Sequence, residues 1–144
     1  MTREDIVGAL FTVLCGSSAF ATTGRKLLHW SKVSEQPALF LRHVNEHYPA
    51  RPTGMPAKIT LDCEAFLYSN AGANPDVAPS IALNALLDAL EATLKPPLGF
   101  QAQTLGGRVQ HCWIEGEVKL EPGDLGGQAI AIVPIKILVP SFGR

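Results

Sequence analysis

The chain of 144 residues is the size of one ordinary domain, and we expect residues 1–144 to fold as a single unit. Hydrophobic residues make up 47% of the chain and charged residues only 17%, which excludes intrinsic disorder and predicts a substantial buried core. Twelve Lys and Arg residues against thirteen Asp and Glu residues give a formal net charge of −1, which excludes the strongly basic field of proteins that grip phosphates.

The first third of the chain predicts one helix and two strands. Apolar residues recur at helical spacing after Thr2, which suits an N-cap, so we expect a helix over residues 3–15. Residues 21–24 predict a loop, and KLLHWSKV, residues 26–33, predicts a strand. ALFLRHVNEHY, residues 38–48, predicts a second strand, with a short helix as the alternative.

The clearest patterns lie in the middle of the chain. KITLDCEAFLY, residues 58–68, alternates apolar and polar side chains and predicts a half-buried strand. Residues 69–79 are polar and turn-rich and predict a loop. The last residue of this loop is a proline, which suits the first position of the helix expected over residues 80–94. That helix carries leucines on one stripe, and Pro96 with Pro97 ends it.

Three strands are expected to complete the sheet, over residues 100–103, 109–120 and 128–139. Residues 121–124 (EPGD) predict a hairpin turn between the last two. Pro134 lies inside the final strand and cannot donate a ladder hydrogen bond, so it predicts an edge position or a bulge. The order of elements predicts an α+β fold, a mainly antiparallel sheet with two helices packed on one face.

Histidines and cysteines are the residues that could carry metal-binding or nucleophilic chemistry in this chain. His43 and His47 are four residues apart and share a face, but a strand would point the nearest carboxylate, Glu46, the opposite way, so no metal site is predicted. His111 and Cys112 are adjacent on a strand and should point to opposite faces, which prevents a catalytic dyad.

Two carboxylate pairs also recur on alternating strands, Asp62 with Glu64 and Glu115 with Glu117. Each pair indicates a solvated or subunit-facing sheet surface. Three cysteines lie far apart without CxxC spacing, so we expect free thiols in a reducing compartment. No secretory signal and no apolar run long enough to span a membrane is expected. The sequence therefore predicts a protein that is not an enzyme, with no catalytic, cofactor-binding or metal-binding residues.

Candidate interface residues come from aromatic side chains, from the polar loop and from the proline of the last strand. Trp and Tyr are common anchors of protein interfaces, although Trp113 is expected in the core. The loop over residues 69–79 has few core anchors, and we expect it to be mobile in the free protein and to order against a partner. The candidate interface residues are Trp30, Phe40, Tyr68, Asn70, Asn74, Asp76 and Pro134.

Five segments carry a resemblance to a known family. They are LLHWSKVSEQPALFLRHVNEHY (27–48), ITLDCEAFLY (59–68), LNALLDALEATL (83–94), QTLGGRVQHCWIEGEV (103–118) and GDLGGQAIAIVPIKILV (123–139). In this order, and at this length, they resemble the tail terminator proteins of long-tailed phages, similar to the minor tail protein U family of lambda-like phages. QPALFL and HCWIEG are the most distinctive of these words.

The resemblance implies a structural role with no cofactor. Such proteins are α+β domains that assemble in the host cytoplasm as a hexameric ring on the finished tail tube, at the head–tail junction of the virion. The implied partners are copies of the same chain, the tail tube protein and the connector or stopper protein of the head. Genome DNA passes through the lumen of the ring without tight binding, and no membrane is involved.

Two other functions stay open at this point. The chain could be another neck protein, such as a head-completion or stopper protein, or the tail tube subunit itself. From a different class, it could be a small cytosolic enzyme or ligand-binding domain that uses His43, His47 or Cys112.

Overall fold

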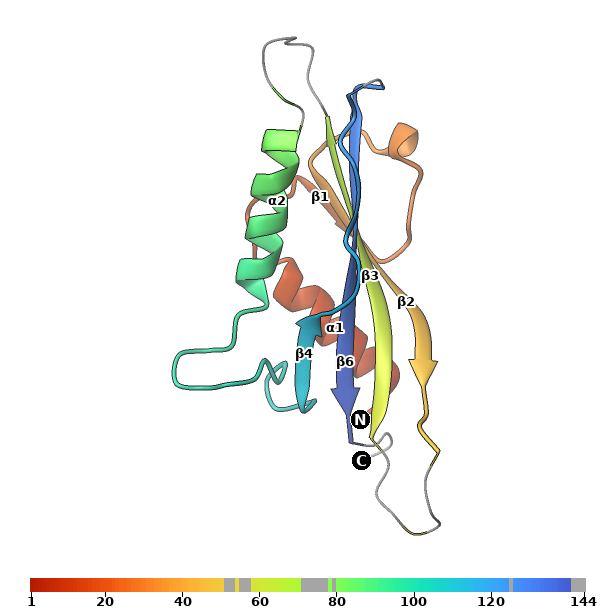
Figure 1. Ribbon diagram of the computed structural model, residues 1–144, viewed down its shortest axis with the longest axis vertical. Helices are drawn as coiled ribbons and strands as arrows, with labels where there is room; N and C mark the ends of the chain where they lie inside the picture. The colour runs from red at the N-terminus through yellow and green to blue at the C-terminus, as the bar shows by residue number, and fades with distance from the viewer. Residues whose placement is uncertain (51–53, 55–57, 71–77, 79, 125, 141–144) are drawn as a thin grey trace.

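The computed structural model describes residues 1–50, 54, 58–70, 78, 80–124 and 126–140. The sheet has six strands, and two α-helices and one short 3-10 helix accompany it within these residues, so the predicted α+β fold is confirmed (Figure 1). In chain order the elements are α1 (Arg3–Leu14), β1 (Thr22–Gly24), η1 (Trp30–Lys32), β2 (Ala38–His47), β3 (Ile59–Asn70), α2 (Ser80–Thr93), β4 (His111–Ile114), β5 (Lys119–Glu121) and β6 (Gln128–Val139). Neither described α-helix has the length and apolar content that crossing a membrane would require.

The sheet is built around β3 and β6, which pair antiparallel over twelve residues each. The strand order is β1-β2-β3-β6-β4, and β5 also pairs with β6. Because β3 already occupies one side of β6 along its whole length, β4 and β5 share the other side. Every pair is antiparallel except the short pair of β1 with β2. As a result, β2 and β4 lie toward opposite edges of the sheet (Figure 1).

Strict alternation in β3 and β6 produces the core. Every second side chain of each strand points to the face that the helices cover, and these side chains are almost completely buried. They form one cluster with apolar residues of both helices, among them Leu10 of α1 and Leu90 of α2. The prediction that both helices pack on one face of the sheet is thus confirmed. We call this side of the sheet the covered face.

Local signals fix the start of α1. The Thr2 side chain accepts a hydrogen bond from the Asp5 N–H at 3.1 Å, and the Asp5 carboxylate accepts one from the Thr2 N–H at 2.8 Å. This capping box satisfies two backbone donors at the helix start. The hydrogen bonds from the Thr2 backbone and side chain lower the pKa of Asp5. The helix itself matches the sequence prediction to within one residue.

The strand predicted over residues 26–33 is wrong. Residues 22–24, expected to be a loop, form β1 instead, and residues 30–32 form η1. The intervening chain runs over the side of the sheet opposite the helices, where Leu27 and Val33 pack on a small cluster of Ala38, Phe40 and Tyr68. The Tyr68 hydroxyl donates to the Leu28 carbonyl at 2.6 Å and ties this segment down. Leu27 and Val33 thus pack against the sheet without strand pairing, whereas Leu28 and Trp30, whose alternation suggested a strand, are exposed.

The later strand predictions need two further corrections. Residues 100–103 do not form a strand, and residues 109–120 form two short strands, β4 and β5, instead of one. The ladder breaks at Gly116, whose φ of +117° is disfavoured for residues with a Cβ. The hairpin predicted at residues 121–124 does join β5 to β6.

Pro134 does not lie on an edge strand, because β6 has neighbours on both sides. Its carbonyl accepts a hydrogen bond from the Glu115 N–H at 3.3 Å, on the side of β4 and β5. The N–H and C=O of one strand residue point the same way, so the donor that proline lacks also faces this side. There the ladder is interrupted between β4 and β5, next to Gly116. A central strand thus accommodates proline where its neighbour is broken.

Candidate assembly surfaces

The aromatic residues predicted for an interface occupy different depths. Trp30 begins η1 and is 38% exposed, and its ring lies 4.8 Å from that of His29. Phe40 and Tyr68 are only 2% and 4% exposed, with ring centroids 5.7 Å apart. These two side chains are therefore enclosed within the chain, where they pack against the segment of residues 25–37. Burial also raises the pKa of Tyr68.

The other predicted interface residues lie at the end of β3 and in the middle of β6. Asn70 is the last residue of β3 and is exposed, so the strand runs two residues into the segment predicted as a loop. Asn74 and Asp76 lie outside the described residues, as does most of residues 71–79. Pro134 is half-buried on the side of the sheet away from the helices. The structure does not bring these residues together into one patch with Trp30.

Other segments cover only part of the side of the sheet away from the helices, and we call the uncovered part the open face. Residues 25–37 cover only the end of this side near Tyr68. The open face carries apolar side chains that are half-buried although they lie on the central strands and on β4: Phe66, Trp113, Ile132, Pro134 and Leu138. The charged residues of β2, β3 and β6 on this face are Arg42, Asp62, Glu64 and Lys136, and Glu115, Lys119 and Glu121 lie on the same side of the sheet next to β6. Asp62 and Glu64 lie on the side of the sheet opposite the helices, as their alternation predicts, and both are half-buried.

Polar contacts on the open face are few and local. Lys136 Nζ lies 2.8 Å from Asp62 Oδ1 across the β3–β6 pair. The Arg42 guanidinium lies over the Phe66 ring at 5.8 Å from its centroid, and no ion pair of Arg42 occurs among the described residues. Trp113 Nε1 donates to Glu115 at 3.2 Å. Trp113 is half-buried on this face, so its predicted place in the core is wrong.

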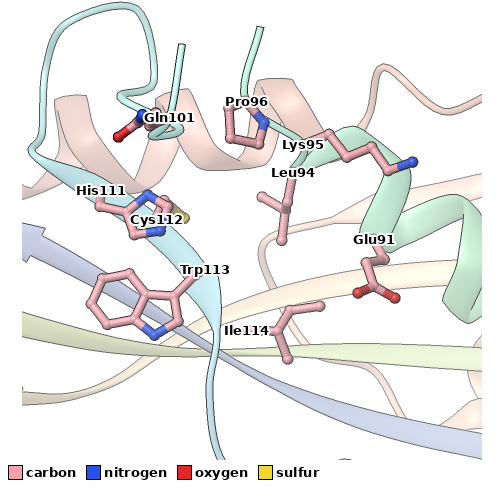
Figure 2. A pocket seen from close by; sticks show the side chains of 9 residues that line it. All are labelled: Glu91, Leu94, Lys95, Pro96, Gln101, His111, Cys112, Trp113 and Ile114. Atoms are coloured by element: carbon pink, nitrogen blue, oxygen red, sulfur yellow. The ribbon is translucent and has the colours of Figure 1, made fainter.

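A cavity of about 370 Å³ borders the outer edge of β4 (Figure 2). Its lining residues come from the end of α2, from the following loop and from β4, and they are Glu91, Leu94, Lys95, Pro96, Gln101, His111, Cys112, Trp113 and Ile114. His111 Nδ1 accepts a hydrogen bond from the Gln103 N–H at 3.1 Å, and the His111 ring stacks on Trp113 at 4.9 Å. These contacts join the start of β4 to the loop that precedes it, beside the cavity.

A second, more apolar hollow lies between α2 and β5. It measures about 310 Å³ and is lined by Leu87, Leu90, Glu91, Ile114, Val118, Leu120 and Val133. Leu120 is 51% exposed at its rim. In the nearby loop, Leu98 is fully exposed and Phe100 is 68% exposed, which exceeds what an isolated chain usually leaves in water at neighbouring positions. Sequence reasoning missed this apolar loop. Its signal was the run PPLGF, residues 96–100, in which turn-forming prolines and a glycine flank apolar side chains.

The two histidines weighed as metal ligands are separated by a bulge in β2. The register against β3 shifts between His43 and Asn45, which puts His43 and Glu46 on the covered face and His47 on the other. His43 Nε2 lies 3.5 Å from Glu46 Oε1, so the predicted divergence of these two side chains is wrong. Among the described residues, no three His, Cys, Asp or Glu side chains gather as ligands.

Glu46 is the centre of a polar cluster at the rim of the covered face. The Arg3 guanidinium binds its carboxylate, and the Tyr48 hydroxyl donates to the same carboxylate at 3.2 Å. The hydrogen bond from Arg3 is the main cause that lowers the pKa of Glu46, with a smaller effect from Tyr48. The cluster thus ties α1 to the end of β2. Its chemistry is that of a structural ion pair.

Cys112 has none of the features of an activated nucleophile. It is 1% exposed and points to the covered face, while His111 points to the open face, as the sequence predicted. Burial raises the pKa of the Cys112 thiol to about 12. Burial therefore disfavours the thiolate, which is the reactive form. The described surfaces offer apolar contact area and unpaired sheet edges, which suit binding to other protein surfaces.

Comparison with known proteins adds one finding. No protein-family model matches the chain, and no curated protein does either. Among solved structures, a chain in the virion of a native gene transfer agent particle has a similar fold, with a TM-score of 0.58 at 9% sequence identity. The similarity covers 94% of this chain and 95% of that chain. The two chains therefore share the arrangement of helices and strands almost from end to end.

Proposed function

We propose that this chain is a virion structural protein of a tailed phage or phage-like particle, and specifically a tail terminator. In this role its copies form a ring, expected to be a hexamer, on the end of the finished tail tube. The ring stops tube polymerisation and offers the surface to which the head joins. It acts at the head–tail junction without a cofactor and without catalysing a reaction.

The observation that carries the proposal is the shared fold. A virion chain of a gene transfer agent particle matches this chain over nearly the full length of both. The resemblance of five ordered segments, including QPALFL and HCWIEG, to tail terminators points the same way.

The surfaces of the protomer suit assembly. A subunit of a ring needs two different patches that complement each other, so that each copy binds the next head to tail. The open face, the apolar hollow beside α2 and the exposed Leu98 and Phe100 provide apolar surface for neighbours. The proposed partners are further copies, the tail tube protein and a connector or stopper protein. Near-neutral net charge suits a ring that genome DNA passes through without being held.

Electron microscopy of particles that lack this chain tests the proposal. Deletion of its coding sequence should yield tails longer than normal and without heads, because nothing caps the growing tube. Complementation with the wild-type chain should restore a single tail length.

Two other outcomes would overturn the terminator role. Tails of normal length without heads would identify a joining protein of the neck, and complete absence of tails would identify the tube subunit. Purified chain should also bind duplex DNA weakly and with strong salt dependence, whereas nanomolar binding at physiological salt would contradict passage through the ring.

The enzyme or ligand-binding alternative has its own test. Alanine substitution of His43, His47 or Cys112, combined with metal analysis of the purified chain, would reveal a chemical role. We expect no bound metal, and we expect tail assembly by the His47→Ala variant to match the wild type because His47 is exposed at the end of β2.

A further inference from the structure

Two edges of the sheet are unpaired among the described residues. On one side, β1 covers β2 only from Ala38 to Phe40, which leaves Leu41–His43 without a neighbour before the bulge. On the other side, β4 pairs with β6 alone. Unpaired strand edges present rows of N–H and C=O groups that bind another strand readily.

The hydrogen bonds of β4 show which of its backbone groups are free. The Glu115 N–H donates to the Pro134 carbonyl of β6. Trp113 and His111 lie two and four residues earlier in the strand, so their backbone N–H and C=O groups also point toward β6. Hydrogen bonds alternate along an antiparallel strand, and the N–H and C=O of Cys112 and Ile114 therefore point away from the sheet. Cys112 and Ile114 also help to line the 370 Å³ cavity beside this edge of the sheet (Figure 2).

We propose that the edge of β4 in one copy of this chain pairs with the edge of β2 in the next copy, and that this seam joins the subunits of the ring. The proposal rests on the proposed function, because it names the contact by which the ring forms. The two edges belong to opposite sides of one sheet, so every copy uses both and the contact is head to tail (Figure 1).

Strand direction and length agree with such a seam. Since β2, β3, β6 and β4 alternate in direction, β4 of one copy and β2 of the next run antiparallel, and the alternation continues across the contact. The free stretch of β2 has three residues and β4 has four. Strand addition at an open edge is a known mode of protein recognition in which backbone hydrogen bonds supply affinity.

The side chains favour one register. Neighbouring strands must keep open-face residues opposite one another, so Arg42 can oppose His111, Trp113 or Glu115. The central alignment sets Arg42 opposite Trp113 and diagonal to Glu115. An arginine on a tryptophan ring and beside a carboxylate gains both cation–π and ionic attraction. Arg42 has no ion pair among the described residues, and Glu115 is exposed.

The surrounding charges are complementary as well. Residues 22–48, which flank the β2 edge, contain four Lys and Arg residues and two Glu residues. Residues 88–121, which flank the β4 edge, contain five Asp and Glu residues and three Lys and Arg residues. Opposite net charge on two contacting surfaces steers association and disfavours pairing of like edges.

A charge swap tests the seam. Arg42→Glu and Glu115→Arg should each weaken ring formation at least about tenfold in sedimentation or native mass spectrometry, and the double variant should recover to within about threefold of wild type. Within one chain these residues lie three strands apart, about 14 Å, so recovery can only come from a contact between copies. Lys58→Glu and Asp124→Arg, which are exposed and lie outside both flanking ranges, serve as matched controls and should leave ring formation unchanged.

A disulfide measurement covers the case in which a charge variant folds poorly. Arg42→Cys with Trp113→Cys, in a Cys15→Ser background, should give oxidised chains linked in a ladder that ends at the ring size. Lys32→Cys with Trp113→Cys should give none. The proposed seam would be wrong if both single charge variants formed rings of normal stability, or if the Arg42→Cys with Trp113→Cys chain gave no ladder of disulfide-linked chains. Neither result would contradict the proposed function. A wild-type chain that neither self-associates nor binds tail tubes would overturn the proposed function itself.

Discussion

The two faces of the sheet both carry apolar residues, but the side chains of the two faces are buried to different extents. On β3 and β6, the residues that point to the helices are no more than 5% exposed, whereas their neighbours that point the other way are mostly half-buried. The second set is nonetheless apolar at Phe66, Ile130, Ile132 and Leu138. The strands therefore supply apolar side chains to both faces, but the α-helices among the described residues pack on only one of them. Such surface on a protomer is typical of a protein completed by neighbours.

Thiol chemistry gives the largest expected contrast between the covered face and the rest of the chain. Burial raises the pKa of Cys63 and Cys112 to about 12, from an ordinary value of 9.0, whereas Cys15 is only partly buried. At pH 8 we expect the first two thiols to react with a maleimide or disulfide reagent on the order of 10³-fold more slowly than Cys15. Mass spectrometry of labelled peptides measures the ratio.

The same shift predicts a pH dependence of stability. The unfolded chain ionises these thiols near pH 9, while the folded chain keeps them neutral up to about pH 12. The free energy of unfolding should therefore fall as the pH rises from about 9 to about 12. Fast labelling of Cys63 or Cys112 in the folded protein would show that the covered face is not sealed.

A matched pair of isoleucines on β6 compares the two faces directly. Ile135 is fully buried against the helices, and Ile132 is half-buried on the open face. Ile135→Ala should lower the free energy of unfolding by about 2–4 kcal/mol, because it leaves a cavity in a packed core. Ile132→Ala should cost about 1 kcal/mol or less in the single chain. Urea denaturation of both variants measures the difference, and equal losses would contradict the distinction between the faces.

Gly116 tests the break between β4 and β5 that accommodates Pro134. Its φ is +117°, and a Cβ would lie 3.3 Å from Pro134 Cγ. Gly116→Ala should therefore destabilise the protein by about 1–3 kcal/mol in thermal or chemical denaturation. Gly126→Ala, where a Cβ would meet nothing within 4 Å, should leave stability unchanged or slightly higher. A tolerated alanine at position 116 would show that the break does not depend on this backbone conformation.

The smallest expected effect lies at the rim of the covered face. The hydrogen bond from Arg3 lowers the pKa of Glu46, so the ionised carboxylate stabilises the fold above its unfolded pKa and this stabilisation disappears as the pH falls through the folded pKa. Glu46→Gln should cost less than about 1 kcal/mol at pH 7, because the pair is partly exposed to solvent. The difference from wild type should vanish in acid. Denaturation curves at pH 7 and pH 3 measure it.

The sequence predicted the elements whose pattern arises within one segment. Residues 58–68 and 128–139 alternate because each strand has a covered side, and the Thr2 cap and the prolines after the second helix mark helix ends locally. The strand expected over residues 26–33 is wrong because Leu27 and Val33 pack on the opposite side of the sheet while Leu28 and Trp30 stay exposed, and no strand pairing fixes this segment. Phe40 and Tyr68 are predicted interface residues because they are aromatic, but residues 25–37 cover their side chains.

What the sequence by itself determined about this protein is therefore its class, an α+β chain with a mainly antiparallel sheet, and the covered sides of its two long strands. Only the tertiary structure decided which apolar residues stay uncovered, that a bulge turns Glu46 toward His43, and that Pro134 lies in a central strand beside a break. The physical reason is that periodicity reports how a segment divides its own side chains between two faces. Which face a helix then covers, and which edge remains unpaired, depends on contacts between residues far apart in the chain.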